Sequence, residues 1–480
     1  MRPIVPFLAL SLLAPAIAPA QERSLEPPPG VELTGAPSLP ADLPTRLRRY
    51  TEARSAAFAG WASGTREMLV RTRFANAPQV HLVRSPGGAR TQLSFFEQPV
   101  GLMSPSPARG GPTVIGMDRN GDEFVQLFRF DPATGDTVLL TDGRQSQNGG
   151  VAWSLAGDRI AFASTMRNGT DRDIWVMDPR DPASRRLAYE AKGGGWAVGG
   201  WLPDGRGLLL GESRSVEQSR IWRLDLGTGR AALLLPRDTA GASANATYSV
   251  AGITPDGRTA WINTDRGGEF RGLATLDLAT AALTPFRGAP KGEVEGATLS
   301  RDGRRLAFTV NDAGQSRLYV MSTASRTPRL VPGVPTGTIG GMGWHPDGNL
   351  LGFTLGSARS PGDAWSYDAA ANRAIRWTES ELGGVHAAEL RDPEPVRWTS
   401  FDGREITGFL YRPPARFTGR RPVIIDIHGG PESQARPGFR GRSNYYLQEL
   451  GVAILTPNVR GSTGFGRTFV SLDNGLKRED

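Results

Sequence analysis

The chain contains no cysteine in its 480 residues. Disulfides therefore contribute nothing to its stability, and no thiol can act as a nucleophile or a lipid attachment point. Lysine is nearly absent as well, because only Lys192, Lys291 and Lys477 occur and the formal net charge of +8 comes from arginine. The arginines are scattered among acidic residues and form no runs, which indicates a solvated surface and argues against a nucleic-acid partner.

Long apolar runs are missing after the first twenty residues. Residues 1–20 contain Arg2, an apolar stretch from Ile4 to Leu13, and small residues before Gln21, a pattern typical of a cleavable signal peptide. A membrane anchor is the alternative, but this stretch is short and interrupted by proline, whereas a spanning helix needs about 20 apolar residues. We therefore expect a secreted or periplasmic protein with no membrane span after cleavage.

Short strand-like runs and Asp-Gly turns are abundant, and they repeat. After a Pro-rich entry segment at residues 21–45, which favours extended structure, turn glycines recur at intervals of roughly 45 to 52 residues. These glycines are Gly64, Gly110, Gly157, Gly205, Gly257, Gly303 and Gly348. Such a period is typical of four-stranded β-propeller blades. The seven units predict an all-β, seven-bladed propeller of the TolB/WD40 type over residues 46–377.

One turn of the repeat, Asp118 to Phe124, spaces its acidic residues like a calcium loop. It lacks the glutamate that such a loop carries at its twelfth position, and it lies between two strand-like runs. A hairpin turn is favoured, with Glu123 free to point into a propeller tunnel. We expect no metal site and no cofactor.

The pattern changes after Trp377. Residues 378–397 form a polar connection, and residues 398–480 begin with two short strands around Asp402. Two apolar runs follow, one ending at His428 and one beginning at Gly451, with a helix-like segment between them. Apolar strands separated by a helix indicate buried parallel strands in an α/β domain.

Four segments together resemble the prolyl oligopeptidase family of serine peptidases, in particular its acylaminoacyl-peptidase and dipeptidyl-peptidase-like bacterial members. They are RSAAFAGWASGTREMLVRTRFANAPQVHLV, SFDGREITGFLYRP, HGGPESQ and GVAILTPNVRGSTGFGRTF, which start at Arg54, Ser400, His428 and Gly451. The resemblance implies that the propeller gates access to an α/β-hydrolase domain. That domain would hydrolyse short peptides through an acyl-enzyme, using a Ser-Asp-His triad.

The resemblance also assigns a role to the turn His428, Gly429 and Gly430. In this family the corresponding turn lies on the oxyanion side of the site, so Gly430 is the expected backbone N–H donor and His428 shapes the turn. Glycine lets the backbone approach a substrate carbonyl closely. The alternative is that these residues form only a tight turn at the end of a strand.

The catalytic residues themselves are missing. A hydrolase of this type carries its serine in Gly-x-Ser-x-Gly, followed by the acid and then the histidine. Four serines stand two positions after a glycine, and none has a second glycine two positions later: Ser213, Ser243, Ser316 and Ser443. Of the four histidines, His81, His345, His386 and His428, none follows His428. Ser462 lies among glycines, but we expect it to belong to a loop and not to act as a nucleophile.

We therefore expect the chain as given to be a truncated and inactive part of a peptidase. In members of the resembled family, the chain continues beyond the position of Asp480 into a helix and the turn that carries the nucleophile. A non-catalytic TolB-like propeller that binds peptides or proteins is one alternative. An esterase of the same fold is another. The sequence leaves the oligomeric state open.

Overall fold

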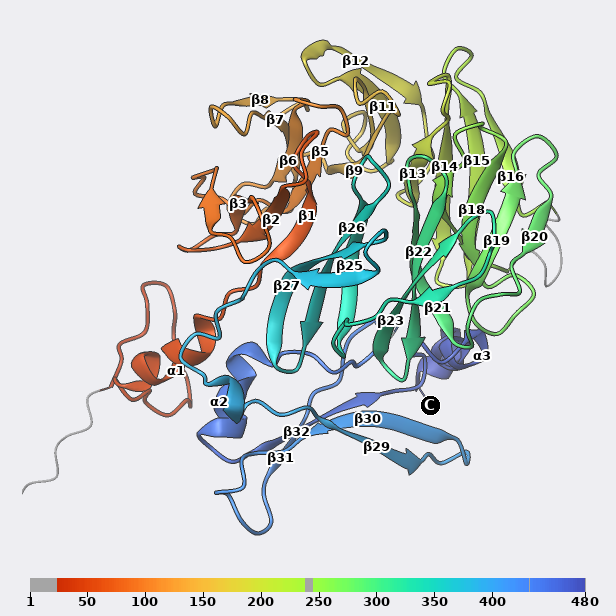
Figure 1. Cartoon of the computed structure of the whole chain (residues 1–480). Helices are drawn as coiled ribbons and strands as arrows, with labels where there is room; N and C mark the ends of the chain where they lie inside the picture. Colours follow the sequence, from red (N-terminus) through yellow and green to blue (C-terminus); the bar gives the residue numbers. More distant parts are fainter. Residues whose placement is uncertain (1–23, 238–244, 431, 480) are drawn as a thin grey trace, which may run out of the picture.

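The computed structural model describes residues 24–237, 245–430 and 432–479, and the expected signal peptide at residues 1–20 lies outside them. Strands dominate the described chain, and they form eight four-stranded sheets (Figure 1). Seven of the sheets follow one another along the chain and are antiparallel throughout. The eighth, near the C-terminus, is mixed.

The first three sheets contain β1 (Ala57–Trp61), β2 (Met68–Thr72), β3 (Gln79–Val83) and β4 (Arg90–Gln92); β5 (Leu102–Pro105), β6 (Thr113–Met117), β7 (Gln126–Phe130) and β8 (Thr137–Leu139); β9 (Asn148–Trp153), β10 (Ile160–Ser164), β11 (Asp173–Asp178) and β12 (Asp181–Tyr189). The next two contain β13 (Trp196–Trp201), β14 (Gly207–Ser215), β15 (Gln218–Asp225) and β16 (Ala231–Leu235); β17 (Tyr248–Ile253), β18 (Thr259–Thr264), β19 (Gly272–Asp277) and β20 (Leu283–Pro285).

The sixth and seventh sheets contain β21 (Glu293–Leu299), β22 (Arg305–Asp312), β23 (Gln315–Ser322) and β24 (Arg329–Leu330); β25 (Thr338–Trp344), β26 (Leu350–Ser357), β27 (Ser360–Asp368) and β28 (Arg373–Arg376). The eighth contains β29 (Glu394–Thr399), β30 (Glu405–Tyr411), β31 (Val423–Ile425) and β32 (Ala453–Asn458). The helices are α1 (Leu43–Thr51), α2 (Asn444–Gln448) and α3 (Arg467–Val470), with 3-10 turns η2 (Ala387–Glu389), η3 (Gly441–Ser443), η4 (Ser471–Asp473) and η5 (Gly475–Glu479).

The first strands of the seven antiparallel sheets form a closed ring. Each of β1, β5, β9, β13, β17 and β21 contacts the first strand of the next sheet, and β25 returns to contact β1. The turn after each first strand contains one of the seven repeat glycines, whose φ angles all lie between +66° and +78°. Only glycine adopts this conformation without strain. The arrangement is a β-propeller (Figure 1).

The cores of this ring lie between neighbouring sheets. Seven buried apolar clusters each draw side chains from two adjacent sheets, and one of them joins the first sheet to the seventh. That cluster contains Phe58 and Trp61 from β1 together with Leu350 and Trp377. Because each sheet buries both faces in this way, the ring depends on contacts at every interface between sheets.

The interface between the first and seventh sheets is the closure seam, defined here by Phe58, Trp61, Arg66, His345 and Asp347. No strand is shared across it, because each sheet comes from one continuous segment. Main-chain and side-chain contacts hold it: the Ala56 amide donates to the carbonyl of Gly362 at 2.9 Å, and Trp61 Nε1 donates to the carbonyl of residue 343 at 3.0 Å. Arg66 pairs with Asp347 at 2.7 Å, and His345 Nε2 lies 3.0 Å from the carbonyl of residue 65.

The closure seam should be sensitive to acid. Burial raises the pKa of Asp347, but hydrogen bonds from the Asn349 amide, Arg66 and His345 outweigh this effect and hold the pKa at about 2. Because the ordinary value is 3.8, the ionised form stabilises the fold above about pH 4, and this contribution is lost as pH falls toward 2. We expect Asp347→Asn to lower the unfolding free energy by about 1–2 kcal/mol relative to wild type at neutral pH. Urea titrations at about pH 6 and about pH 3 should show that difference shrinking; a constant difference would contradict the role assigned to Asp347.

The predicted turn at residues 118–124 is present as the connection between β6 and β7. Asn120, Gly121 and Glu123 adopt positive φ angles, and the amide of Arg119 donates to Asp122 Oδ1. Glu123 is exposed to solvent. Among the described residues, no group of three or more His, Cys, Asp or Glu side chains is placed to hold a metal ion.

The C-terminal sheet has the order β29-β30-β32-β31. β31 and β32 pair in parallel and the other neighbours pair antiparallel, with α2 between β31 and β32 in the chain. β32 is buried as predicted, but the prediction that β31 is buried is wrong, because Val423 is 52% exposed and Ile425 is 61% exposed. The reason is position, because β31 is an edge strand with a partner on one side only.

The entry segment ends in a helix that packs on the C-terminal part. Residues 24–42 contain no helix, and α1 then begins at Leu43 with Pro44 in its first turn. Tyr50 of α1 donates a 2.6 Å hydrogen bond to Glu449, and Arg49 pairs with Glu389 and Glu449. Burial and the bond to Glu449 raise the pKa of Tyr50 above its usual range. α1 therefore connects the start of the propeller to α2 (Figure 1).

Candidate functional site

The turn His428–Gly430 lies where the parallel strands of the C-terminal sheet end. β31 ends at Ile425, and the turn follows it at the carboxyl edge that β31 shares with β32. In sheets with parallel strands, ligands bind at this edge. The edge faces the propeller, since the chain after β32 reaches α3, where the Thr468 amide donates to Glu269 of the β18–β19 connection at 2.8 Å.

His428 is held by a residue from the loop that follows β32. Its Nε2 lies 3.0 Å from Ser462 Oγ, and Ser462 Oγ donates to the carbonyl of Val459 at 2.6 Å. The hydroxyl hydrogen of Ser462 is therefore committed to Val459, so His428 donates to the oxygen and is not placed to remove its proton. Ser462 is also fully buried, at 0% exposure. This geometry supports an orienting role for Ser462, which the sequence did not predict, and no role as a nucleophile.

Gly430 occupies a position that other residues cannot easily fill. Its φ angle is +125°, and a Cβ atom there would lie 2.7 Å from the backbone nitrogen of Glu432. Gly429 has open space at the same place. Within the described ranges no acceptor is found for the Gly430 N–H, which leaves it able to donate to a ligand. Pro431, the residue that follows Gly430 in the segment HGGPESQ, lies outside the described residues.

The segment after the turn is fixed to the propeller. Gln434 Oε1 accepts a 2.6 Å hydrogen bond from Asn311, and Arg436 pairs with Glu295 at 2.6 Å. Sequence reasoning missed both contacts, because more than a hundred residues separate the partners and no local pattern links them. Only the folded chain brings Asn311 and Glu295 of the propeller into contact with the residues that follow Gly430.

The other serines and histidines considered from the sequence are dispersed. His81 lies buried on β3, where burial lowers its pKa, His345 lies in the closure seam, and His386 precedes η2. Ser213 lies on β14 and Ser443 in η3, whereas Ser243 is outside the described residues. Ser316 Oγ donates to Glu295, next to Arg436. The structure therefore brings no serine and histidine together as nucleophile and base among the described residues.

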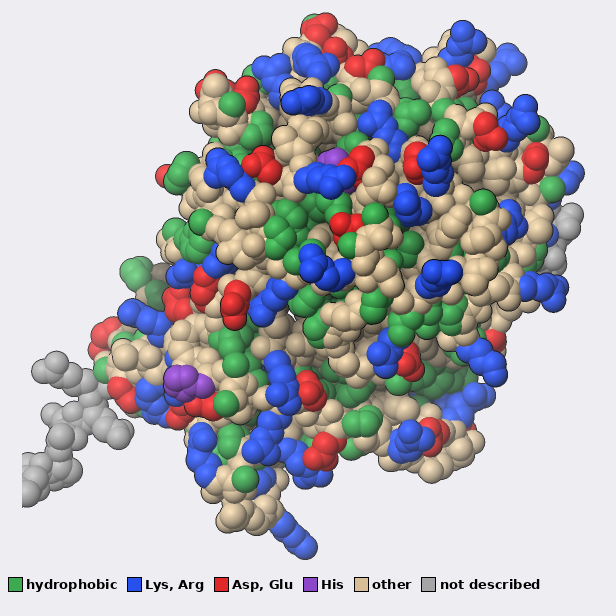
Figure 2. All heavy atoms as spheres, viewed as in Figure 1, with side chains coloured by type: hydrophobic (Ala, Val, Ile, Leu, Met, Phe, Trp, Pro, Cys, Tyr) green, Lys and Arg blue, Asp and Glu red, His purple; other side chains and the backbone are tan. Residues whose placement is uncertain are grey.

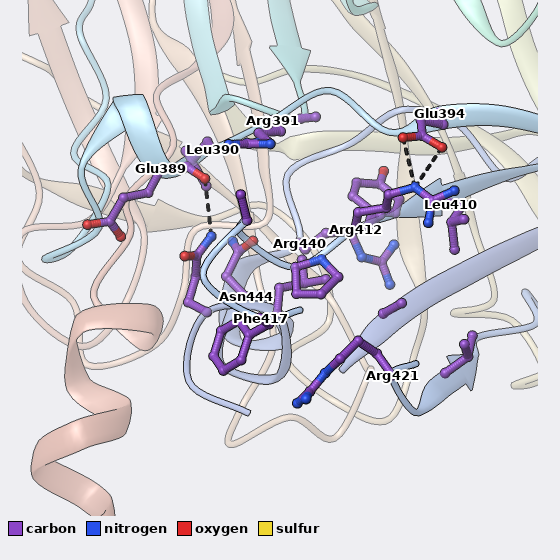
Figure 3. A pocket seen from close by; sticks show the side chains of 18 of the residues that line it. Glu389, Leu390, Arg391, Glu394, Leu410, Arg412, Phe417, Arg421, Arg440 and Asn444 are labelled. Atoms are coloured by element: carbon purple, nitrogen blue, oxygen red, sulfur yellow. Dashed lines mark hydrogen bonds and ion pairs between the residues drawn. The ribbon is translucent and has the colours of Figure 1, made fainter. Parts of the chain in front are cut away.

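A cavity of ≈ 540 Å³ lies on the C-terminal sheet, away from the turn (Figure 3). Its wall includes Val423 of β31 and charged side chains, among them Arg412, whose Nε donates to both oxygens of Glu394 at 2.8 Å. Asn444 is buried there, and its Nδ2 has no hydrogen-bond partner in the described part of the chain. Residues 426–437 take no part in the wall, so this cavity and the turn are separate features.

The visible surface carries mixed charge. On the face shown in Figure 2, Lys and Arg side chains alternate with Asp and Glu over both the propeller and the C-terminal part, and neither sign forms a continuous region. In the ranges that the structure covers, no helix has the length and apolar character needed to cross a bilayer.

Comparisons with known proteins agree with the fold. No family model matches the chain. Dipeptidyl aminopeptidase BIII of Pseudoxanthomonas mexicana is 25% identical over 375 residues, which is 75% of this chain and 52% of that protein. Prolyl oligopeptidase A of Amanita bisporigera is 25% identical over 359 residues, covering 72% and 43%. The chain thus spans about half the length of these curated relatives.

Solved structures show the same fold at lower identity. A prolyl endopeptidase matches with a TM-score of 0.75 at 14% identity, covering 91% of this chain and 66% of that one. A puromycin hydrolase matches with a TM-score of 0.71 at 17% identity, covering 90% and 70%. These curated homologues and structural neighbours are prolyl oligopeptidase family peptidases, and they confirm the resemblance of the chain to that family.

Proposed function

We propose that this chain is an exported peptidase component that combines a seven-bladed β-propeller with the first part of an α/β-hydrolase domain, and that the site at His428–Gly430 serves the hydrolysis of short peptides. The observation that carries the proposal is the position of the turn. The Gly430 N–H, for which no acceptor is found among the described residues, stands at the carboxyl edge of a parallel strand pair and beside the propeller. The proposal of peptide substrates rests on the names of the relatives, which are peptidases, and the proposal of export rests on the pattern of residues 1–20.

In the proposed reaction the Gly430 N–H donates to the carbonyl oxygen as negative charge develops on it. A serine hydroxyl, which this chain does not supply on a Gly-x-Ser-x-Gly turn, attacks the carbonyl carbon, and its proton passes to the amine that leaves as the C–N bond breaks. Water then hydrolyses the acyl-enzyme, which frees the carboxylic acid and restores the hydroxyl. His428 is held by Ser462 and shapes the turn. The 480 residues supply no serine on a Gly-x-Ser-x-Gly turn, so we propose that the chain alone is inactive.

The exposed edge of β31 supports the hydrolase assignment. Val423, Ile424, Ile425 and Ile427 are apolar and exposed, although a strand of a parallel sheet is normally covered on both faces. A further parallel strand beside β31 would cover this edge. Its carboxyl end would then lie next to the His428–Gly430 turn, where a nucleophile is required.

The ring itself supports the gating role of the propeller. At the end of the ring that carries the repeat turns, a cavity of ≈ 310 Å³ is lined by Trp153, Trp201 and Trp344. Arg301 reaches from the sixth sheet across this opening to the carbonyls of Pro107 and Leu155 in the second and third sheets. A side chain that bridges opposite sheets narrows the opening, which favours exclusion of folded proteins.

The proposed function is tested with a fluorophosphonate probe that labels activated serines. We expect no labelling and no peptide hydrolysis by the 480-residue chain, because no serine among the described residues has a base placed to remove its proton. We expect a chain extended in frame past Asp480 to be labelled on a single serine within Gly-x-Ser-x-Gly and to hydrolyse short peptides. Labelling of Ser462 in the 480-residue chain would contradict the site described above. Peptide binding without labelling or turnover by the extended chain would favour the non-catalytic propeller, and ester turnover alone would favour an esterase.

A further inference from the structure

We propose that the sixth sheet of the propeller, through Glu295 of β21 and the β22–β23 hairpin, positions the oxyanion-side turn by holding the segment that follows it. The inference rests on the proposed function in one respect, the assignment of the Gly430 N–H as an oxyanion donor. The positioning residues are Glu295, Asn311 and Ser316. They touch the segment 434–437 that follows the turn, and none of them belongs to the C-terminal sheet.

Arg436 is the main contact on the C-terminal side. Its Nε donates to the carbonyl of Gly314 at 2.8 Å, one terminal nitrogen donates to Ser316 Oγ at 3.0 Å, and the other pairs with Glu295 at 2.6 Å. All three guanidinium nitrogens therefore bind the sixth sheet of the propeller. A planar fork with three fixed acceptors specifies orientation as well as distance, which a lysine in the same place would not do.

The acceptors are themselves held in place. Ser316 Oγ donates to Glu295 at 2.8 Å, so the two partners of Arg436 are linked to each other. Asn311 accepts from the amide of Gly314 at 2.8 Å and donates to Gln434 at 2.6 Å. Gly314 has a φ angle of +86°, and a Cβ atom there would lie 3.0 Å from Phe409 of β30. The hairpin thus fits closely against the segment that it holds.

The same segment is connected in the other direction to His428. The amide of Ala435 donates to Asn458 at the end of β32 at 2.7 Å, and the amide of Thr463 donates to the carbonyl of Ser433 at 2.8 Å. Ser462, adjacent to Thr463, orients His428. Residues 428–430 and 432–437 are therefore fixed between the loop after β32 on one side and the sixth sheet of the propeller on the other. Loss of the hairpin contacts would leave the turn supported from one side only.

Burial makes the loss of either partner of the Arg436–Glu295 ion pair costly. The Arg436–Glu295 pair is largely buried, with 24% and 18% of the two side chains exposed. Removing one member of such a pair leaves the other charge in a poorly solvated place, which costs more than an exposed ion pair contributes. Glu295 and Arg436 therefore act as a unit in holding the segment after the turn.

The test uses NMR spectra of the full 480-residue chain with ¹³C-labelled histidine, in which the imidazole resonances of the four histidines are followed. The resonance that disappears in His428→Gln is assigned to His428. In Glu295→Ala we expect the His428 resonance to shift and broaden. We also expect amide hydrogen exchange in residues 426–437 to become about tenfold faster or more, because the segment loses a charge-assisted contact. Glu295→Gln, which retains an acceptor without the charge, should restore part of the protection.

The matched control is Glu293→Ala. Glu293 is two positions earlier on β21 and forms an equivalent 2.6 Å contact with Arg271, entirely within the propeller. Its loss should leave the His428 resonance and exchange in 426–437 unchanged, even if the propeller becomes less stable. Asn311→Ala provides a second variant, in case Glu295→Ala does not fold. If Glu295→Ala or Asn311→Ala folds and neither readout differs from that of the control, the proposal is overturned. These readouts require no catalysis, so they stay informative if the extended chain proves not to be a peptidase.

Discussion

Replacing Gly430 with alanine should destabilise the C-terminal part and abolish most of the oxyanion contribution. At a φ angle of +125° an L side chain costs about 1–3 kcal/mol in backbone strain alone. The new Cβ would also lie 2.7 Å from the backbone nitrogen of Glu432, so the turn must move. In the 480-residue chain we expect a lower unfolding free energy and a shifted His428 resonance. In a catalytically complete chain we expect kcat to fall by about 10²-fold or more, with a small change in KM.

Gly429→Ala provides the matched control for this prediction. The adjacent position has open space where the Cβ atom would be placed, and its φ angle is not positive. We expect its stability to change by less than about 0.5 kcal/mol and the His428 resonance to remain in place. Equal effects of the two alanines on stability and on kcat would show that the turn has no special geometry, and would support the alternative of a simple strand-exit turn.

Replacing Trp61 with alanine should lower the unfolding free energy by about 3–5 kcal/mol, the usual cost of truncating a large buried aromatic side chain. Trp61 is buried in the closure seam, where its ring meets Phe58, His345 and Trp377 edge-on. Its indole N–H also donates across the seam. The first and seventh sheets have no direct loop between them, so these side chains and the main-chain bond from Ala56 to Gly362 must resist separation without a connecting loop.

Trp201→Ala separates the cost of a cavity from the effect on ring closure. Trp201 is equally buried and donates its indole N–H to the carbonyl of Ala152 at 3.0 Å, but a short loop at residues 190–195 also joins the two sheets. Both variants should lose stability in urea titrations. Only Trp61→Ala should accelerate amide exchange in β1 and β25 well before global unfolding, because chain connectivity limits the opening between sheets three and four. Faster exchange in both variants would argue against a distinct closure seam.

Local patterns predicted the elements where the residues themselves impose the conformation. Asp402-Gly403 predicted the hairpin between β29 and β30, and Gly403 has a φ angle of +83° there. The apolar run after Gly451 predicted the buried strand β32. The prediction that β31 is buried was wrong. An apolar strand gains free energy when it is covered, but its sequence does not show whether a neighbouring strand is present to cover it.

The candidate site was accessible to sequence reasoning only in part. The turn at His428, Gly429 and Gly430 was found from its residues, since a strand that ends in glycines is a local signal. The bond from His428 to Ser462 was not found, and neither was the contact of Arg436 with Glu295. Arginine, glutamate and serine are common on surfaces, and their types carry no information about partners that lie far away in the chain.

The sequence by itself determined the period of the repeat, the turns that its glycines permit, and the absence of a serine nucleophile on a glycine turn, because each is a property of short stretches of chain. The tertiary structure alone decided how the ring closes at Trp61, which strand remains exposed, and which propeller hairpin reaches the segment after Gly430. Those outcomes depend on packing between distant segments, whose free energy exists only after the chain has folded.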